Sequence, residues 1–318
     1  MAPLIPQIMM HPEGPQVSQM VFGTWRLCNT NGWEDDQSLA TPQSVLERIE
    51  ACISLGITTF DLADIYGGYR YEKVFGDGLA LKPELREKIQ LITKTGIKVP
   101  SDAWSEKVEV NHYDTTFEHI VSQVEKSLTY LRTSYIDVLL IHRPDFLMDA
   151  DEVAKAMIHL KDSGKVKYFG VSNHTVSQME LLQSRLPFPL VTNQIEFSPS
   201  CLDGMFDGTL DYAQKTRAKP MCWSPLGGGA LLGSSSDPKV QRLQKACKAV
   251  GDSFSPALPL DLVAYAFLLR HPTKPVIVLG TNKIERLKSV ATLFDRNITL
   301  SRQQWYSIWE ASKGHSVP

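Results

Sequence analysis

The sequence predicts an α/β protein in which eight parallel strands close into a (β/α)8 TIM barrel. We also expect an N-terminal extension, long rim loops and an extra C-terminal helix. Eight short apolar segments occur along the 318 residues, and most alternate with segments whose apolar residues recur at helical spacing. Strands that alternate with helices indicate a parallel sheet, and eight such units are typical of a closed barrel. The length matches one barrel with insertions, so we expect a single domain over residues 1–318.

The expected strands are short apolar runs that end in polar residues or glycine. An open, doubly wound sheet is the alternative, and it is typically marked by Gly-x-Gly-x-x-Gly after the first strand. Only Gly23-Thr24 stands there, and the Gly227-Gly228-Gly229 run follows the seventh strand, which favours the barrel. The expected strands are residues 20–25, 56–60, 89–93, 136–141, 166–171, 189–193, 219–223 and 275–279.

The first helix has clear start and stop signals. Thr41 is a suitable N-cap, Pro42 suits the first helical position, and Gly56 ends the pattern. Further helices are expected near residues 72–80 and 176–182, and at 260–270, 284–292 and 302–311.

Two more helices lie in the middle of the chain. Residues 115–118, Thr-Thr-Phe-Glu, fit a capping box at the start of one helix. Either Asp149 or Asp151 begins the next, which Gly164 ends. The segment between residues 95 and 113 is polar, and we expect it to be irregular.

Composition excludes several classes of function. The formal net charge of −2 offers no strong field for nucleic acid or an anionic membrane. The five cysteines are scattered without a C-x-x-C spacing, which predicts neither a metal site nor a disulfide framework. We see no signal peptide and no apolar run of membrane-spanning length, so a reducing cytoplasm is expected.

Polar side chains stand where the expected strands end. Asp61 ends the second strand, and Tyr66 follows five residues later in a loop that contains two glycines. The carboxyl ends of barrel strands share one rim, so residues far apart in sequence are expected to converge there. The strand-end set is Asp61, Lys94, His142, Asn173, Gln194, Ser224 and Thr281.

Three of these positions, Asp61, Lys94 and His142, together with Tyr66, resemble the catalytic tetrad of the aldo-keto reductases. The resemblance covers nearly the whole chain, and the tail, from residue 302 to the end, is similar to a bacterial subgroup of predicted oxidoreductases. It implies an NADPH-dependent oxidoreductase that reduces aldehydes or ketones to alcohols. The motifs are Phe-Gly-Thr-Trp (22–25), Phe-Asp-x-Ala-Asp-x-Tyr-Gly (60–67), Ile-His-Arg-Pro-Asp (141–145), Gly-Lys-Val-x-x-Phe-Gly-Val-Ser-Asn (164–173), Asn-Gln (193–194), Trp-Ser-Pro-Leu (223–226) and Gly-Thr-Asn-Lys-Ile-Glu-Arg (280–286).

These residue types suit carbonyl reduction. When hydride reaches the carbonyl carbon, negative charge develops on the oxygen and a proton donor must meet it. A tyrosine keeps its proton at neutral pH because its ordinary pKa is about 10, and a neighbouring ammonium is expected to lower that pKa. Tyr66 is therefore the expected general acid and Lys94 its cationic neighbour. Asp61 is expected to hold Lys94, and His142 to orient the carbonyl and assist the oxyanion.

The resemblance also implies an NADP(H) site. Ser172, Asn173 and Gln194 match the positions that bind the nicotinamide carboxamide, and Trp223 matches the aromatic ring that stacks on the nicotinamide. Lys283 and Arg286 are expected to hold the 2′-phosphate, which favours NADP(H) over NAD(H). The remaining expected cofactor contacts are Gly23, Thr24, Trp25, Asp61, Ser224, Pro225, Leu226, Gly227, Gly280 and Thr281.

The sequence departs from the family near the adenine end. Many relatives have lysine where this chain has Gly280. Ser289 and Val290 stand where the family has acidic and amide residues, and they cannot form the same hydrogen bonds.

The expected partner is a small-molecule carbonyl substrate, and the chain is expected to be a monomer or a small homo-oligomer. Variable loops build the family's substrate pocket, here residues 97–113, 198–207 and the C-terminal segment. Candidate pocket walls are Trp25, Trp33, Trp104 and Phe197. The alternative function is a redox-sensing regulatory subunit with bound cofactor, because channel β-subunits of the superfamily share the Gly-Thr-Trp and Trp-Ser-Pro-Leu motifs.

Overall fold

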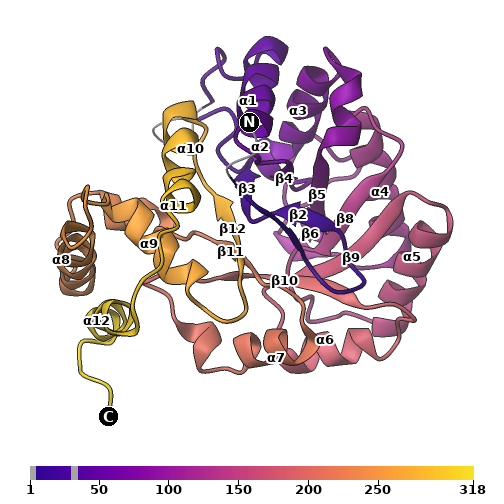
Figure 1. Ribbon diagram of the computed structural model, residues 1–318. Helices are drawn as coiled ribbons and strands as arrows, with labels where there is room; N and C mark the ends of the chain where they lie inside the picture. The colour runs from indigo at the N-terminus through magenta and orange to yellow at the C-terminus, as the bar shows by residue number, and fades with distance from the viewer. Residues whose placement is uncertain (1–4, 30–34) are drawn as a thin grey trace.

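Eight parallel strands form a closed barrel, which confirms the predicted fold class (Figure 1). The computed structural model describes residues 5–29 and 35–318. The strands follow one another around the ring in chain order, and the last pairs with the first, with Leu279 opposite Phe22. They are β3 (Met20–Gly23), β4 (Thr59–Asp61), β5 (Gln90–Thr95), β8 (Ile136–Ile141), β9 (Val166–Ser172), β10 (Leu190–Glu196), β11 (Met221–Trp223) and β12 (Val276–Leu279).

A hairpin of two short strands covers one end of the ring, where it appears in indigo across the strands (Figure 1). Its strands, β1 (Gln7–Met9) and β2 (Gln16–Ser18), pair antiparallel. Met10 and Val17 are fully buried against barrel residues such as Val138. The hairpin therefore closes the amino-terminal end of the barrel and leaves the carboxyl ends of the strands for the site.

Helices surround the barrel, and their start signals are partly those that the sequence predicts. Thr41 caps α1 by accepting a hydrogen bond from the Ser44 N–H at 3.2 Å. Asp149, rather than Asp151, caps α5. The helices are α1 (Pro42–Ser54), α2 (Tyr66–Tyr69), α3 (Tyr71–Leu79), α4 (Phe117–Tyr130), α5 (Ala150–Asp162), α6 (Val176–Gln183), α7 (Thr209–Thr216), α8 (Pro238–Asp252), α9 (Leu260–Leu269), α10 (Ile284–Val290), α11 (Thr292–Asp295) and α12 (Arg302–Lys313), with 3₁₀ turns η1 (Pro83–Lys88), η2 (Asp203–Met205) and η3 (Gly227–Leu232).

The prediction of a capping box at residues 115–118 is wrong, because the helix begins one position later than expected. Thr116 is the N-cap of α4 and accepts from the His119 N–H, so a histidine occupies the third helical position and the reciprocal bond of a capping box is absent there. Thr115 instead donates to Asp145 at 2.8 Å, which ties the start of α4 to the loop after β8.

Other parts differ from the expectation as well. The segment 95–113 is not wholly irregular, because β6 (Ile97–Lys98) pairs antiparallel with β7 (His112–Tyr113). Helices α7 and α8 are additional, and the expected helix at 284–292 breaks near Ala291 into α10 and α11. Figure 1 shows α8 and α12 side by side on the outer side of the ring, where Arg242 donates to the Ala311 carbonyl.

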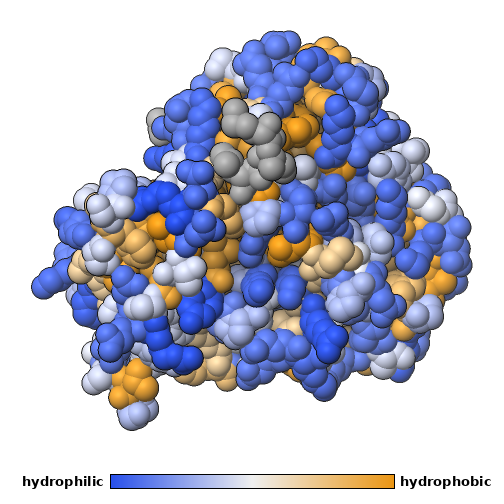
Figure 2. All heavy atoms as spheres, in the orientation of Figure 1, coloured by the Kyte–Doolittle hydropathy of each residue, from blue (hydrophilic) through white to orange (hydrophobic). Residues whose placement is uncertain are grey.

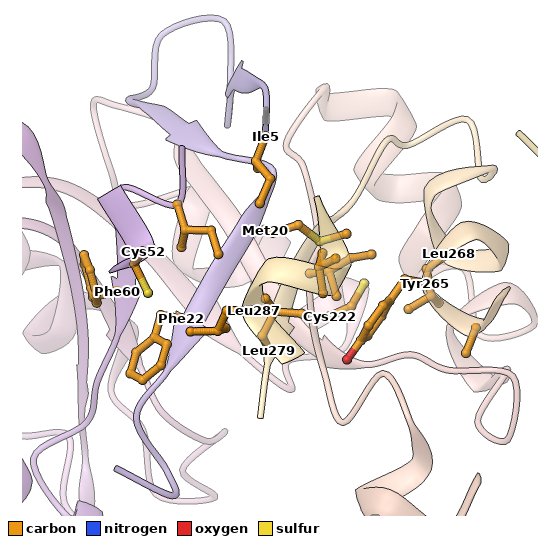
Figure 3. Packing of buried hydrophobic residues seen from close by; sticks show 14 of the residues in the cluster. Ile5, Met20, Phe22, Cys52, Phe60, Cys222, Tyr265, Leu268, Leu279 and Leu287 are labelled. Carbon is orange, nitrogen blue, oxygen red and sulfur yellow. The ribbon is translucent and has the colours of Figure 1, made fainter. Parts of the chain in front are cut away.

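The seam between the first and last strands is closely packed. Figure 3 shows Phe22 on β3 among buried neighbours from β12 and α10, including Leu279 and Leu287. The Phe22 and Phe60 ring centroids lie 5.8 Å apart. A side chain at Gly23 would meet the Leu279 carbonyl oxygen at 2.9 Å, so glycine is needed for β3 to approach β12.

The surface is mixed in character. Figure 2 shows one face that is predominantly hydrophilic, with hydrophobic residues in small separate groups. Within the described ranges, no helix is long and apolar enough to cross a bilayer.

Candidate active site

Three strand ends bring a carboxylate, an ammonium and an imidazole together at the carboxyl end of the barrel. Asp61 ends β4, Lys94 lies near the end of β5, and His142 follows β8 directly. Lys94 is completely buried, and its Nζ atom donates to Asp61 Oδ2 at 2.8 Å, to the Leu62 carbonyl at 2.7 Å and to Tyr66 Oη at 3.0 Å. An ammonium has three N–H donors, so these bonds use all of them and fix the position of Nζ.

The phenol of Tyr66 is held so that its proton points away from Lys94. An ammonium can only donate, so the oxygen of Tyr66 accepts in the bond with Lys94. The Tyr66 ring lies between Trp25, whose ring centroid is 4.9 Å away, and His142, at 5.8 Å. The O–H of Tyr66 is thereby left to donate to another group near His142.

A left-handed turn presents Tyr66 to the other strand ends. Gly67 and Gly68 have φ angles of 58° and 64°, which residues with a side chain rarely adopt. A Cβ atom on Gly67 would also lie 2.1 Å from the ring of Tyr71. Both facts explain why the motif continues with glycine after the tyrosine.

Burial sets the ionisation of Tyr66 and Lys94. Burial raises the pKa of Tyr66 by more than Lys94 lowers it, so the pKa lies above its ordinary value although Lys94 acts in the expected direction. Burial also lowers the pKa of Lys94, but the charges of and hydrogen bonds to Asp61 and Tyr66 together raise it above its ordinary value. At neutral pH the site therefore holds a neutral phenol beside an ammonium.

His142 is a neutral imidazole. Burial, followed by the positive charges of Lys94 and Arg143, holds the pKa of His142 well below its ordinary value. Its Nδ1 atom is buried and has no hydrogen-bond partner among the residues that the structure describes. A neutral ring can give one N–H to a ligand and keep one nitrogen as an acceptor.

The amide and hydroxyl groups after β9 and β10 form a chain of hydrogen bonds to Trp223. Trp223 Nε1 donates to Asn173 Oδ1 at 3.0 Å, and Asn173 Nδ2 donates to Ser172 Oγ at 2.8 Å. Gln194 Nε2 donates to Asp61 Oδ1 at 2.8 Å, which the sequence does not reveal. This bond connects the expected carboxamide site directly to the tetrad.

Thr24 lies at the carboxyl end of β3 and supports Asp61 from its other side. Its backbone N–H and its hydroxyl both donate to the Asp61 carbonyl oxygen at 2.9 Å. Gly23 is buried at the barrel seam, whereas Trp25 is 45% exposed. Trp25 is therefore the member of this motif most accessible to a ligand.

The loop after β11 carries a left-handed residue and a row of glycines. Ser224 has a φ of 50°, and its carbonyl accepts the Gly227 N–H at 2.8 Å, while Leu226 accepts the Gly229 N–H at 3.1 Å. The N–H groups of two of the three glycines are thus already used within the turn. Pro225 is buried beside Ser224.

The loop after β12 presents two exposed cations. Thr281 Oγ1 accepts the Lys283 N–H at 3.2 Å at the start of α10, and Gly280 is open to its surroundings. The side chains of Lys283 and Arg286 are exposed and make no ion pair with any described residue.

Ser289 and Val290, which stand where the family has residues near the adenine, make no side-chain arrangement for a ligand. Val290 is buried in the core, and Ser289 donates to the Arg286 carbonyl within its own helix. Neither side chain is arranged to bind a ligand.

The prediction that Phe197 lines the substrate pocket is wrong. Phe197 is completely buried, and its ring centroid lies 6.4 Å from that of Phe267. Trp104 packs 5.0 Å from the Tyr69 ring, and Trp33 lies outside the described residues. Over residues 5–29 and 35–318, no three His, Cys, Asp or Glu side chains gather as ligands for a metal ion.

Arg143 is not among the site residues predicted from the sequence, although it follows His142 in the same motif. Its guanidinium carbon lies 5.7 Å from the centroid of the Trp223 ring. The sequence signal that could have identified Arg143 is its position as a cation directly after the strand-end His142.

The chain is similar to known proteins over nearly its whole length. The model of the Aldo/keto reductase family matches residues 19–313. Oxidoreductase YdhF of Escherichia coli K12 is 43% identical over 315 residues, 99% of this chain and 100% of YdhF. The 6-dehydroglucose reductase of Agrobacterium fabrum is 44% identical over 302 residues, 95% of this chain and 96% of that enzyme. Among solved structures, glycerol dehydrogenase AKR11B4 of Gluconobacter oxydans has a TM-score of 0.80 and 24% identity, with 98% and 94% of the two chains covered, which bears on the fold alone.

Proposed function

Because the chain belongs to the aldo-keto reductase family, we propose that it is an NADPH-dependent oxidoreductase that reduces aldehydes or ketones to alcohols, with Tyr66 as general acid. The observation that carries the proposal is the buried Lys94 ammonium, which joins Asp61 to the phenol of Tyr66. The family match over residues 19–313 supports one catalytic domain.

The residues beside the tetrad fit a nicotinamide cofactor. Trp223 is partly exposed at the end of its strand and is held at its edge by Asn173, which suits stacking on a flat ring. Ser172 and Asn173 are the polar groups next to it, and Gln194 links them to Asp61. When bound, the reduced nicotinamide supplies the hydride that the carbonyl carbon accepts.

The chain's own residues supply the proton and the charge stabilisation. Tyr66 donates its phenolic proton to the carbonyl oxygen, and Lys94 stabilises the phenolate that remains. Neutral His142 orients the carbonyl by a hydrogen bond without placing another cation beside Lys94. Asp61 keeps the ammonium charged and in place.

The preference for NADPH rests on Lys283 and Arg286. Both are free of ion pairs among the described residues and lie at the start of α10, where cations are not favoured by the helix dipole. A 2′-phosphate between them would offset that cost through charge-assisted hydrogen bonds.

Replacement of Tyr66 tests the proposal. The purified chain is expected to oxidise NADPH in the presence of 4-nitrobenzaldehyde, and Tyr66→Phe is expected to lose roughly 10²- to 10⁴-fold in kcat. Cofactor binding should persist, as measured by quenching of tryptophan fluorescence. Tyr212→Phe, on the remote helix α7, serves as the matched control. Unchanged turnover in Tyr66→Phe would refute the assignment.

A further inference from the structure

We propose that Arg143 recognises hydroxyl groups of the substrate, and that the substrate is a neutral, polyhydroxylated carbonyl compound. The inference rests on the proposed reductase function and adds a substrate class and a specificity-determining residue to it.

Arg143 lies beside the groups that would perform the chemistry. It follows His142 directly after β8, and its guanidinium carbon is 5.7 Å from the Trp223 ring centroid. Its positive charge lowers the pKa of both Tyr66 and His142, so it lies within electrostatic reach of both. A ligand whose carbonyl contacts Tyr66 and His142 therefore has Arg143 beside it.

Arg143 is half-buried, and its guanidinium has no polar partner among the described residues. It makes no hydrogen bond or ion pair with any residue that the structure describes. Two arginines that are buried more deeply are held differently: Arg86 donates to Asp137 and to Thr133, and Arg48 donates to three backbone carbonyls. A guanidinium carries five N–H donors, and leaving them unused in a half-buried position has a cost that a bound ligand would offset.

A carboxylate near Arg143 is also unpaired. Glu196 ends β10 opposite Trp223 in the strand register, and its carboxylate has no hydrogen bond or ion pair within the described part of the chain. Burial raises the pKa of Glu196, the charge of Asp203 raises it further, and Arg143 lowers it, so Asp203 and Arg143 each lie within electrostatic reach of Glu196. Arg143 and Glu196 nevertheless stay more than the 4.0 Å of an ion pair apart.

This charge pattern distinguishes between substrate classes. An anionic group bound at Arg143 would also be repelled by the negative charge of Glu196, which lies within electrostatic reach of Arg143. The other pair at the site, Lys94 with Asp61, is already neutral as a whole. A hydroxyl group can accept from a guanidinium and donate to a carboxylate at the same time, so several hydroxyls on one neutral molecule satisfy both side chains.

Aldehydes that differ only in hydroxyl groups test the proposal. We would measure kcat and KM with NADPH for D-glyceraldehyde, propanal and the anionic succinic semialdehyde, in the wild type, Arg143→Met and Arg143→Lys. The readout is the ratio of kcat/KM for D-glyceraldehyde to that for propanal, because the effect of Arg143 on Tyr66 acts on both substrates. Arg185→Met, which breaks an exposed ion pair with Asp151, is the matched control.

In Arg143→Met the ratio is expected to fall roughly 10- to 100-fold, mainly through the KM for D-glyceraldehyde. Arg143→Lys should lose less, because lysine keeps the charge but not the planar fork of donors. A ratio that does not change in Arg143→Met, or a larger loss for succinic semialdehyde than for D-glyceraldehyde, would overturn the proposal. Failure of the wild type to reduce any aldehyde would instead overturn the proposed function as well.

Discussion

Removal of the buried ammonium by Lys94→Met should destabilise the protein as well as inactivate it. Lys94 has no exposed surface and offsets the charge of Asp61, whose side chain is only 3% exposed. Removing one partner of a buried ion pair costs about 3–5 kcal/mol, because the other charge remains buried without compensation. With an unfolding entropy of about 2.1 cal/mol/K per residue, a chain of 318 residues should lose roughly 4–7 °C in Tm.

Differential scanning calorimetry of four proteins checks this reasoning: the wild type, Lys94→Met, Asp61→Asn and the double variant. The amide oxygen that Asp61→Asn introduces can still accept the bond from Gln194, so the double variant contains no uncompensated charge. It should therefore be more stable than the sum of the single losses predicts, by about 2 kcal/mol or more. If Lys94→Met unfolds at the wild-type temperature, or if the two losses simply add, the pair is not coupled as the structure implies.

Two further predictions concern cofactor choice and pH. Arg286→Ala should weaken NADPH binding roughly 10- to 100-fold and leave NADH binding nearly unchanged. A fluorescence titration with each cofactor measures this, with Lys288→Ala as the control. An equal loss of affinity for both cofactors would mean that Arg286 is structural. Burial raises the pKa of Glu72 to about 7, although Thr93 and Ser127 donate to it, so the folded state favours its protonated form. The contribution of Glu72 to stability is thus present at acid pH and lost as pH rises from about 4.5 to about 7. Urea unfolding at several pH values should show the wild type losing up to ~3 kcal/mol relative to Glu72→Gln over this interval, and a loss in the opposite direction would contradict the assignment.

Much of the barrel could be predicted because its strands are continuous apolar runs. The run at residues 136–141 is an example: it is buried along its whole length as β8, and its end places His142 at the rim. Helix α8 was not among the expected helices, but it was predictable too, because Asp237 and Pro238 give a start signal and Val240, Leu243 and Cys247 follow at helical spacing. The hairpin β1–β2 was not, because strands of three residues carry no usable periodicity.

The positions in the candidate site were predictable from sequence, but their interactions were not. Strand-end spacing brings Asp61, Lys94 and His142 to one rim in any closed barrel. The bond from Gln194 to Asp61 joins residues 133 positions apart, and only the curvature of the sheet decides it. The net shift of the Tyr66 pKa is the balance between burial, which raises it, and the charge of Lys94, which lowers it. A sequence shows the charge but not the degree of burial.

The cost of the Lys94–Asp61 pair is itself an argument for function. A buried ion pair seldom stabilises a fold more than apolar residues of the same size would, because desolvation offsets most of the attraction. Here hydrogen bonds with Gln194, Thr24 and the Leu62 carbonyl offset part of that cost, so three further groups are committed to holding the pair in place. A neutral phenol beside a permanently charged ammonium gains nothing for folding that a phenylalanine and a leucine would not supply. It does provide a proton that can leave and a charge that is already in place when it does. On this reasoning, Tyr66→Phe should fold at least as stably as Lys94→Met while sharing its loss of activity, so stability and turnover should separate between the two variants.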